Sequence, residues 1–197
     1  MTARAARVRI LLPASVALVA FLAGFAVARW WPSKAALSAV VEGAPPHLVA
    51  FDGALIRAAG ESGVDADLLR GLVAAESGGD SRARSRAGAV GLAQLLPDTA
   101  AEEAKSLGIA GTPDLLDPAT SLRLGARHLA RLLEDFSGDP ALALAAYNAG
   151  KASALRWRLR APDTDGAGVV RREAYPETRH YVARVLKFRE AYLAGAR

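Results

Sequence analysis

The 197-residue sequence contains no cysteine, and none of its 20 acidic residues precedes position 30. Without cysteine the chain has no disulfide framework, no thiolate metal site, no thiol nucleophile and no lipid-modified N-terminal cysteine. Runs of alternating β-branched residues are also few, which argues against an all-β fold. Hydrophobic residues make up 52% of the chain, so long low-complexity disorder is excluded and one folded domain is expected.

The net charge of +5 is distributed unevenly along the chain. Residues 1–29 hold four arginines and no acid, residues 30–149 hold 10 basic and 15 acidic groups, and residues 150–197 hold 11 basic and 5 acidic groups. An acidic body with a basic end does not suit nucleic acid, so we predict no nucleic-acid partner. The basic end can attract an anionic polymer or a membrane surface.

Residues 10–28 carry no charge and, as a helix, would span about 28 Å, close to the thickness of a bilayer core. Three arginines precede this run, so we predict a cytoplasmic N-terminus, contact with the inner membrane through residues 10–28 and a periplasmic remainder. Trp30 and Trp31 favour a retained anchor, whereas Ala26-Val27-Ala28 has the small-x-small form of a signal-peptidase site. Both an anchored form and a form released after cleavage near Ala28 stay open.

The chain is therefore divided into a membrane anchor or signal segment over residues 1–31, a linker over 32–50 and a catalytic domain over 51–197. The linker mixes small, polar and proline residues without a clear period. The domain is expected to be all-α, with the N-terminal transmembrane or signal helix before it. Predicted helices cover 52–59, closed by Gly60 and Gly63; 66–76; Thr99 to near Gly108; 118 to near 138; 140–149; and 176 onward.

Aspartates mark the start of three of these helices. Asp65 precedes the second, and Asp117 and Asp139 each stand before a proline at the first helical position. Thr99 and Glu102 have the spacing of a capping box. Residues 151–175 are rich in Arg, Asp and Gly and are expected to form a long excursion without assigned structure.

Glu76 lies on the same helical face as Leu69, Leu72 and Val73. A carboxyl group on an apolar face at a helix C-terminus is desolvated and meets the negative end of the helix dipole, and both effects raise its pKa. Such a group can act as a general acid. A glutamate that points outward at a frayed helix end is the alternative.

Two further segments place polar groups where apolar ones are expected. Gly88 and Gly91 flank a short turn before Gln94, which lies among apolar residues. Tyr147 and Asn148 interrupt a helix of alanines and leucines, and buried polar groups need partners.

In this order the segments resemble the family 1 lytic transglycosylases, the family of the soluble lytic murein transglycosylase catalytic domain, which has a goose-lysozyme-like fold. The resemblance extends over residues 52–190. It rests on Glu76-Ser77, Ser85-x-x-Gly88-Ala89-x-Gly91-Leu92-x-Gln94-Leu95-x-Pro97-x-Thr99-Ala100, Asp117-Pro118 with Gly125, Ala145-Ala146-Tyr147-Asn148-Ala149-Gly150, and Glu177-Thr178-Arg179-x-Tyr181-Val182.

The resemblance implies an all-α, lysozyme-like domain that acts on peptidoglycan glycan strands. Glu76 would be the catalytic acid/base, and Glu177 and Arg179 would brace the cleft. The family has an aromatic residue at position 79 and a methionine at position 93. Gly79 and Ala93 are smaller, so a wider cleft or looser packing is expected. The residues implied to line the glycan cleft are Ser77, Ser85, Gln94, Tyr147, Asn148 and Tyr181.

The implied reaction cleaves the bond between N-acetylmuramic acid and N-acetylglucosamine and leaves a 1,6-anhydromuramoyl end. Most glycosidases use two carboxylates, but only Glu76 is well placed here; Asp80 follows a Gly-Gly break. His47, His128 and His180 lie on separate segments, so we predict no metal and no other cofactor. A monomer is expected. A goose-type lysozyme using water as nucleophile and a catalytically inactive peptidoglycan-binding module remain the alternatives.

Overall fold

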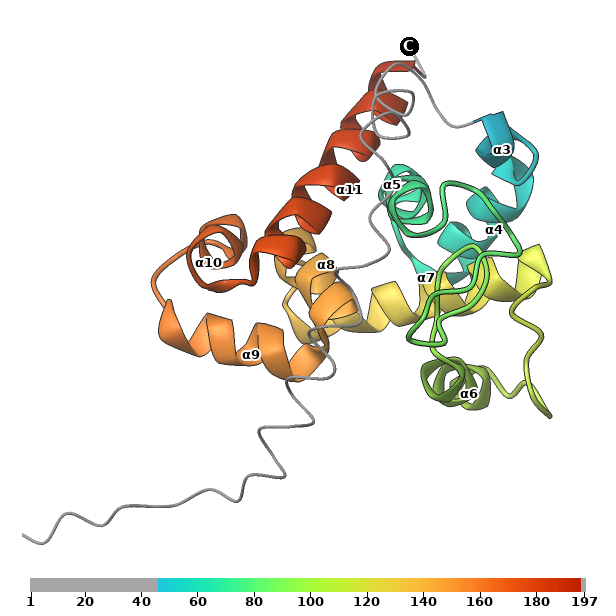
Figure 1. Ribbon diagram of the computed structural model, residues 1–197, viewed down its shortest axis with the longest axis horizontal. Helices are drawn as coiled ribbons and strands as arrows, with labels where there is room; N and C mark the ends of the chain where they lie inside the picture. Colours follow the sequence, from blue (N-terminus) through green and yellow to red (C-terminus); the bar gives the residue numbers. More distant parts are fainter. Residues whose placement is uncertain (1–45, 196–197) are drawn as a thin grey trace, which may run out of the picture. The chain divides into compact units, whose positions relative to one another are not determined.

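The computed structural model describes residues 46–195, and within that range the fold is all-helical. The predicted membrane segment 10–28 and most of the predicted linker 32–50 lie outside the described residues. The part of the chain that is described includes no helix with the length and hydrophobicity needed to span a membrane. The helices in Figure 1 are α3 (Pro46–Val49), α4 (Asp52–Ser62), α5 (Ala66–Glu76), α6 (Pro97–Ser106), α7 (Pro118–Asp135), α8 (Pro140–Ala149), α9 (Lys151–Arg160), α10 (Gly166–Glu173) and α11 (Pro176–Gly195).

The three aspartate caps expected from the sequence are confirmed. Asp65, Asp117 and Asp139 each accept a hydrogen bond from the backbone N–H three residues later, at 2.7, 2.9 and 3.0 Å. These bonds satisfy backbone donors that have no partner inside the helix. The starts of α5, α7 and α8 are therefore set by local sequence.

Two predicted helix boundaries were wrong. Helix α4 continues through Gly60 to Ser62 and ends at Gly63, whose φ of 68° is left-handed. Helix α6 begins at Pro97 because proline already has a helical φ at the first position, and Thr99 makes no capping bond there.

The excursion expected over residues 151–175 instead contains helices α9 and α10. Helix α9 buries Ala154 and Trp157 in the main core, and α10 starts where Asp165 accepts a hydrogen bond from the Gly168 N–H at 2.8 Å. Burial against the rest of the domain therefore gives this charged stretch its structure.

Helix α8 lies at the centre of the main core, with all residues from Ala141 to Ala146 buried. Helices α4, α5, α7, α9, α10 and α11 contribute to the same core. Leu48 of α3 also packs into it, although this residue falls in the stretch predicted as linker. A smaller cluster lies between α6, α7 and the loop that follows α5.

Helix α11 packs along α5, as Figure 1 shows. The approach is close at Gly71, where an added Cβ would lie 2.6 Å from the carbonyl oxygen of Val185. Glycine is therefore needed at this position for the two helices to pack as they do. The packing brings the end of α5, with Glu76, against Tyr181 near the start of α11.

Gly71→Ala is expected to lower the free energy of unfolding by about 1–3 kcal/mol, because the new methyl group must displace the backbone of α11. Gly60→Ala is the matched control, since it also changes a helical glycine but has no heavy atom within 4 Å of the added Cβ. That variant should be more stable by about 0.4–1 kcal/mol. Urea denaturation measures both values, and equal effects of the two substitutions would contradict the close contact.

Candidate active site

Glu76 ends helix α5, and its carboxylate Oε1 accepts a hydrogen bond from the Tyr181 hydroxyl at 2.6 Å. Tyr181 is only 5% exposed, whereas Glu76 keeps part of its surface accessible to solvent. The two residues are 105 positions apart in the chain. Because α11 packs on α5, the carboxyl group of Glu76 is largely enclosed by protein and is still accessible to solvent.

Burial raises the pKa of Glu76 from its ordinary value of 4.5 to about 7. The hydrogen bond from Tyr181 and the positive charge of Arg184 both oppose this rise, and burial outweighs them. Burial also raises the pKa of Tyr181 well above 10, so its hydroxyl keeps its proton and donates it to the hydrogen bond. A substantial fraction of Glu76 is therefore protonated at neutral pH.

Arg184 is a part of this site that the sequence analysis missed. Its guanidinium donates a 2.9 Å hydrogen bond to the Ala75 carbonyl oxygen at the end of α5, and its charge lowers the pKa of Glu76. Arg184 follows Tyr181 by three residues, which places both on one face of α11. That spacing is the signal that could have identified it.

Tyr147 connects helix α8 to the loop that follows α5. Its hydroxyl donates a 2.8 Å hydrogen bond to the Ala93 carbonyl oxygen, and its ring lies 5.0 Å from the His128 ring, centroid to centroid. Burial raises its pKa well above 10, and the charges of Glu76 and Glu103 raise it further. Tyr147 therefore stays neutral, and it lies within electrostatic range of Glu76.

Glu103, on α6, holds His128, whose ring lies beside that of Tyr147. Its side chain is 1% exposed, and its Oε1 forms hydrogen bonds with His128 Nδ1 at 2.9 Å and Arg131 Nε at 2.8 Å. Burial alone would raise the pKa of Glu103, but these two partners lower it below its ordinary range. Glu103 shares a buried helical face with Ala100 and Ala104, so the pattern that singled out Glu76 also applied to it.

Gln94 and Ser85 shape the loop between α5 and α6. Gln94 has a left-handed φ of 47°, and its Nε2 donates hydrogen bonds to the carbonyl oxygens of Ala83 at 3.1 Å and Gly91 at 2.9 Å. Ser85 Oγ accepts a 3.0 Å bond from the Ala89 N–H. Both side chains therefore hold the loop, and the side-chain oxygen of Gln94 makes no hydrogen bond within residues 46–195.

Ser77 and Asn148 also have protein partners. Ser77 Oγ donates to the Val73 carbonyl oxygen at 3.3 Å and accepts from the Gly79 N–H at 3.2 Å, which fixes the turn after α5. Asn148 Oδ1 accepts a 2.8 Å hydrogen bond from the Thr178 hydroxyl, which ties α8 to α11.

The structure thus brings Glu76 and Tyr181 into direct contact and places Tyr147 nearby. The hydrogen bonds of Ser77, Ser85 and Gln94 lie within their own turn or loop, and that of Asn148 joins two helices. No cluster of three or more possible metal-ligating side chains exists within the described residues.

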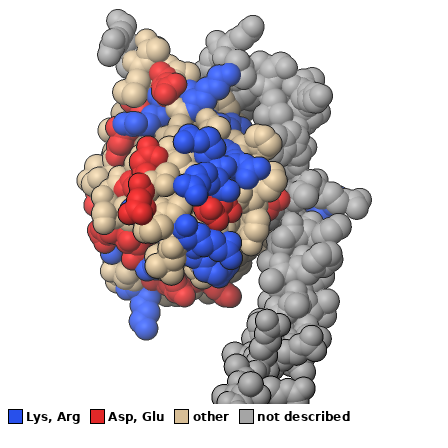
Figure 2. Space-filling model, turned by 90° about the vertical axis from the view of Figure 1, so that its left-hand side faces the viewer, with Lys and Arg blue, Asp and Glu red and all other residues tan. Residues whose placement is uncertain are grey.

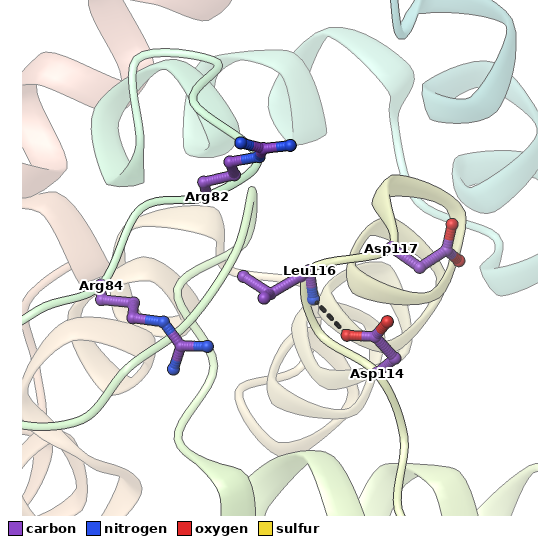
Figure 3. A pocket seen from close by; sticks show the side chains of 5 residues that line it. All are labelled: Arg82, Arg84, Asp114, Leu116 and Asp117. Atoms are coloured by element: carbon purple, nitrogen blue, oxygen red, sulfur yellow. Dashed lines mark hydrogen bonds between the residues drawn. The ribbon is translucent and has the colours of Figure 1, made fainter.

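A pocket of about 640 Å³ lies elsewhere, between the loop after α5 and the segment before α7 (Figure 3). Arg82 and Arg84 line one side, and Asp114, Leu116 and Asp117 line the other. None of the predicted site residues lines this pocket. The candidate active site is therefore placed at Glu76 because of its hydrogen bond with Tyr181 and its raised pKa, and not because of the size of a cavity.

Comparison with known proteins links the domain to enzymes of cell-wall murein. The family model described as transglycosylase SLT domain matches residues 53–169. The soluble lytic murein transglycosylase of Escherichia coli K12 is 34% identical over 121 residues, which are 59% of this chain and 19% of the relative. The chain thus spans about a fifth of the length of this curated relative.

Solved structures give the same result. The lytic transglycosylase Slt of Pseudomonas aeruginosa, in an inactive mutant form, matches with a TM-score of 0.67 and 33% identity, covering 73% of this chain and 24% of that one. The 70 kDa soluble lytic transglycosylase of Escherichia coli matches with a TM-score of 0.70 and 27% identity, covering 74% of this chain and 24% of that one. The lysozyme-like helical fold expected from the resemblance is confirmed.

The raised pKa of Glu76 predicts a pH-dependent difference in stability between the protein and Glu76→Gln. The folded protein holds the proton up to a pKa of about 7, whereas the unfolded chain releases it near 4.5. Stability from this group is fully present below 4.5 and is lost as the pH rises through 7. Glu76→Gln has no such proton to lose. Its free energy of unfolding, relative to that of the unmodified protein, should therefore rise by about 3 kcal/mol between pH 4.5 and pH 8.

Urea unfolding at several pH values measures this difference. Tyr181→Phe should raise the pKa of Glu76 further and move the transition to higher pH, because it removes the hydrogen bond that stabilises the carboxylate. A difference between Glu76→Gln and the unmodified protein that stays constant over the whole range would show that Glu76 ionises normally.

Proposed function

The chain belongs to the transglycosylase SLT domain family, and from this we propose that it is a peptidoglycan lytic transglycosylase. Its substrate would be the glycan strand of peptidoglycan, cleaved between N-acetylmuramic acid and N-acetylglucosamine. The observation that carries the proposal is the enclosed carboxyl group of Glu76, which lies within the stretch that matches the family model, has a pKa of about 7 and accepts a hydrogen bond from Tyr181.

The proposed reaction uses Glu76 twice. The protonated carboxyl group first gives its proton to the oxygen that links the two sugars, and the bond from that oxygen to C1 of the muramoyl residue breaks. The resulting carboxylate then takes the proton of the C6 hydroxyl of the same muramoyl residue, whose oxygen bonds to C1. The product carries a 1,6-anhydro ring, no water is consumed, and Glu76 ends protonated as it began.

Neighbouring groups set the balance between the protonated and the ionised form of Glu76. Burial favours the protonated acid, and the Tyr181 hydrogen bond with the Arg184 charge favours the carboxylate. A pKa near 7 makes both proton transfers feasible at neutral pH. We propose that Tyr147, Asn148 and the side-chain oxygen of Gln94 position the sugar, with Ser77 and Ser85 acting through the turns that they hold.

A lysozyme-like hydrolase would use the same acid with water as the nucleophile. The environments of other carboxyl groups favour the intramolecular route. Glu103 is held by His128 and Arg131, and Asp80 is exposed and accepts a 2.8 Å hydrogen bond from the Arg82 N–H. An inactive binding module would have no need of an enclosed acid with a raised pKa.

Digestion of purified peptidoglycan by the full chain should give products that end in 1,6-anhydromuramic acid. Each product would be lighter by one water than the corresponding hydrolysis product and would resist reduction by borohydride. Mass spectrometry before and after borohydride treatment measures both properties. Products with mainly reducible muramic acid ends would show a hydrolase instead.

Glu76→Gln is the catalytic control for this digestion, because it removes the proton and nearly preserves the shape of the side chain. Its turnover should fall by roughly 10²–10⁴-fold or more. Asp80→Asn is the matched control, since the amide oxygen can still accept the hydrogen bond from Arg82. It should keep nearly full activity. Loss of activity in Asp80→Asn but not in Glu76→Gln would identify Asp80 as the catalytic acid.

We also propose that the domain acts in the periplasm, held at the inner membrane through residues 10–28 or released after cleavage near Ala28. The uncharged run after three arginines supports this orientation. A reporter enzyme fused after Arg197 should lie in the periplasm, and its activity should be found there and not in the cytoplasm. Cytoplasmic activity of the fusion would contradict the orientation, and a soluble form that begins at Arg29 would favour cleavage.

A further inference from the structure

Helix α9 has an outward face that the rest of the domain leaves uncovered. Its inner face buries Ala154 and Trp157, whereas Leu155 and Leu159 on the other face are 41% and 80% exposed. These two leucines are four residues apart, so they lie side by side along the helix. Neighbouring exposed apolar side chains bordered by polar groups are typical of interaction surfaces.

Basic side chains border these leucines. At 100° per residue, Arg156 and Arg160 fall on one side of the leucine pair, and Lys151 and Arg158 fall on the other. Lys151 pairs with Asp135, and Arg158 donates to the Thr164 carbonyl oxygen. Arg156 donates a 3.0 Å hydrogen bond to Ser153, and Arg160 makes no hydrogen bond or ion pair within residues 46–195, so both keep donors available to an anion.

Helix α10, which packs against α9, adds Arg171 and Arg172, both exposed. Figure 2 looks at the side of the molecule on which α9 and α10 lie in Figure 1, and Lys and Arg side chains gather there in a band. Arg156, Arg160, Arg171, Arg172 and the two leucines are together called the α9–α10 face. It combines exposed hydrocarbon with positive charge.

We propose that the α9–α10 face docks on an anionic phospholipid bilayer. Leu155 and Leu159 would enter the boundary between headgroups and acyl chains, and the arginines beside them would bind lipid phosphates. A helix that presents leucines between flanking cationic side chains has the chemistry of a helix lying in the plane of the membrane interface. Long arginine side chains can hold their charge at the headgroups while their carbon stems follow the apolar surface.

Other occupants fit the α9–α10 face less well. A glycan strand or another anionic polymer would satisfy the arginines but would leave the leucines against polar groups or water. A second copy of the same face would bury the leucines but would bring like charges together, which costs binding energy. An anionic bilayer satisfies both features at once.

Docking would also orient the proposed active site. Gly150 alone separates α9 from α8, which carries Tyr147 and Asn148. A docked α9 would therefore hold this part of the site close to the membrane surface. The docking does not depend on the proposed reaction, because it is measured as binding and not as turnover.

The absence of cysteine allows a single dye to report on the α9–α10 face. Leu159→Cys in the full chain is labelled with an environment-sensitive fluorophore and reconstituted into nanodiscs. With a mixture of phosphatidylcholine and phosphatidylglycerol, the emission should shift to the blue and be quenched by nitroxide-labelled lipids. The same dye on Ala101→Cys, an exposed position of α6, should show neither effect.

Charge removal tests the role of the arginines. Arg156→Gln with Arg160→Gln should lower the docking equilibrium constant by about 30-fold, since each basic residue near an anionic surface contributes roughly a fivefold factor to binding. Arg57→Gln with Lys105→Gln removes the same charge from exposed positions of α4 and α6 and should leave docking unchanged. Both double variants should retain the circular dichroism and the peptidoglycan-fragment turnover of the parent.

Three results would overturn the proposal. One is equal dye emission in nanodiscs of phosphatidylcholine alone and of the anionic mixture. A second is a blue shift caused by soluble peptidoglycan fragments without lipid, which would assign the α9–α10 face to the glycan or its peptides. The third is a shift that grows with protein concentration in the absence of lipid, which would show contact between copies of the chain.

Discussion

The hydrogen bond from Tyr181 to Glu76 depends on how closely α11 approaches α5. A carboxyl group at the end of an apolar helix face loses water when a second helix packs on it, and the cost appears as the rise of its pKa to about 7. Tyr181 and Arg184 arrive on that same second helix, so the element that desolvates the acid also brings the groups that limit the rise. Gly71 permits the approach because any side chain there would meet the α11 backbone.

Two glutamates that both lie on buried helix faces show how surroundings decide chemistry. Glu103 is paired with His128 and Arg131, and its pKa lies below the ordinary range, so it remains a carboxylate that holds its neighbours. Glu76 receives one neutral donor and one nearby positive charge, and burial dominates. Glu103 is suited to holding His128 beside Tyr147, and Glu76 is suited to exchanging a proton.

Local signals in the sequence predicted much of the fold. The aspartate caps of α5, α7 and α8 and the apolar stripe that includes Glu76 depend on residues a few positions apart, which a sequence displays directly. Helices α9 and α10 were not predicted, because Trp157 gains its burial from a core assembled from distant segments. For the same reason only the family resemblance placed Tyr181 in the cleft, and its hydrogen bond to Glu76 was not predicted, because periodicity carries no information across 105 positions.

Gly79 and Ala93 are the two departures from the family pattern, and neither of them simply widens the cleft. Ala93 is fully buried, and a Cβ added to Gly125 would lie 2.4 Å from the Ala93 Cβ, so the Ala93 side chain points into the packing between its loop and α7. The backbone oxygen of Ala93 accepts the Tyr147 hydrogen bond, which keeps Tyr147 in place whatever the size of that side chain. Gly79 is different, because its φ of 86° is left-handed and an aromatic residue there would be strained in this turn. The loop after Glu76 therefore follows a path that suits glycine, and the site holds Tyr147 through a backbone oxygen of that loop.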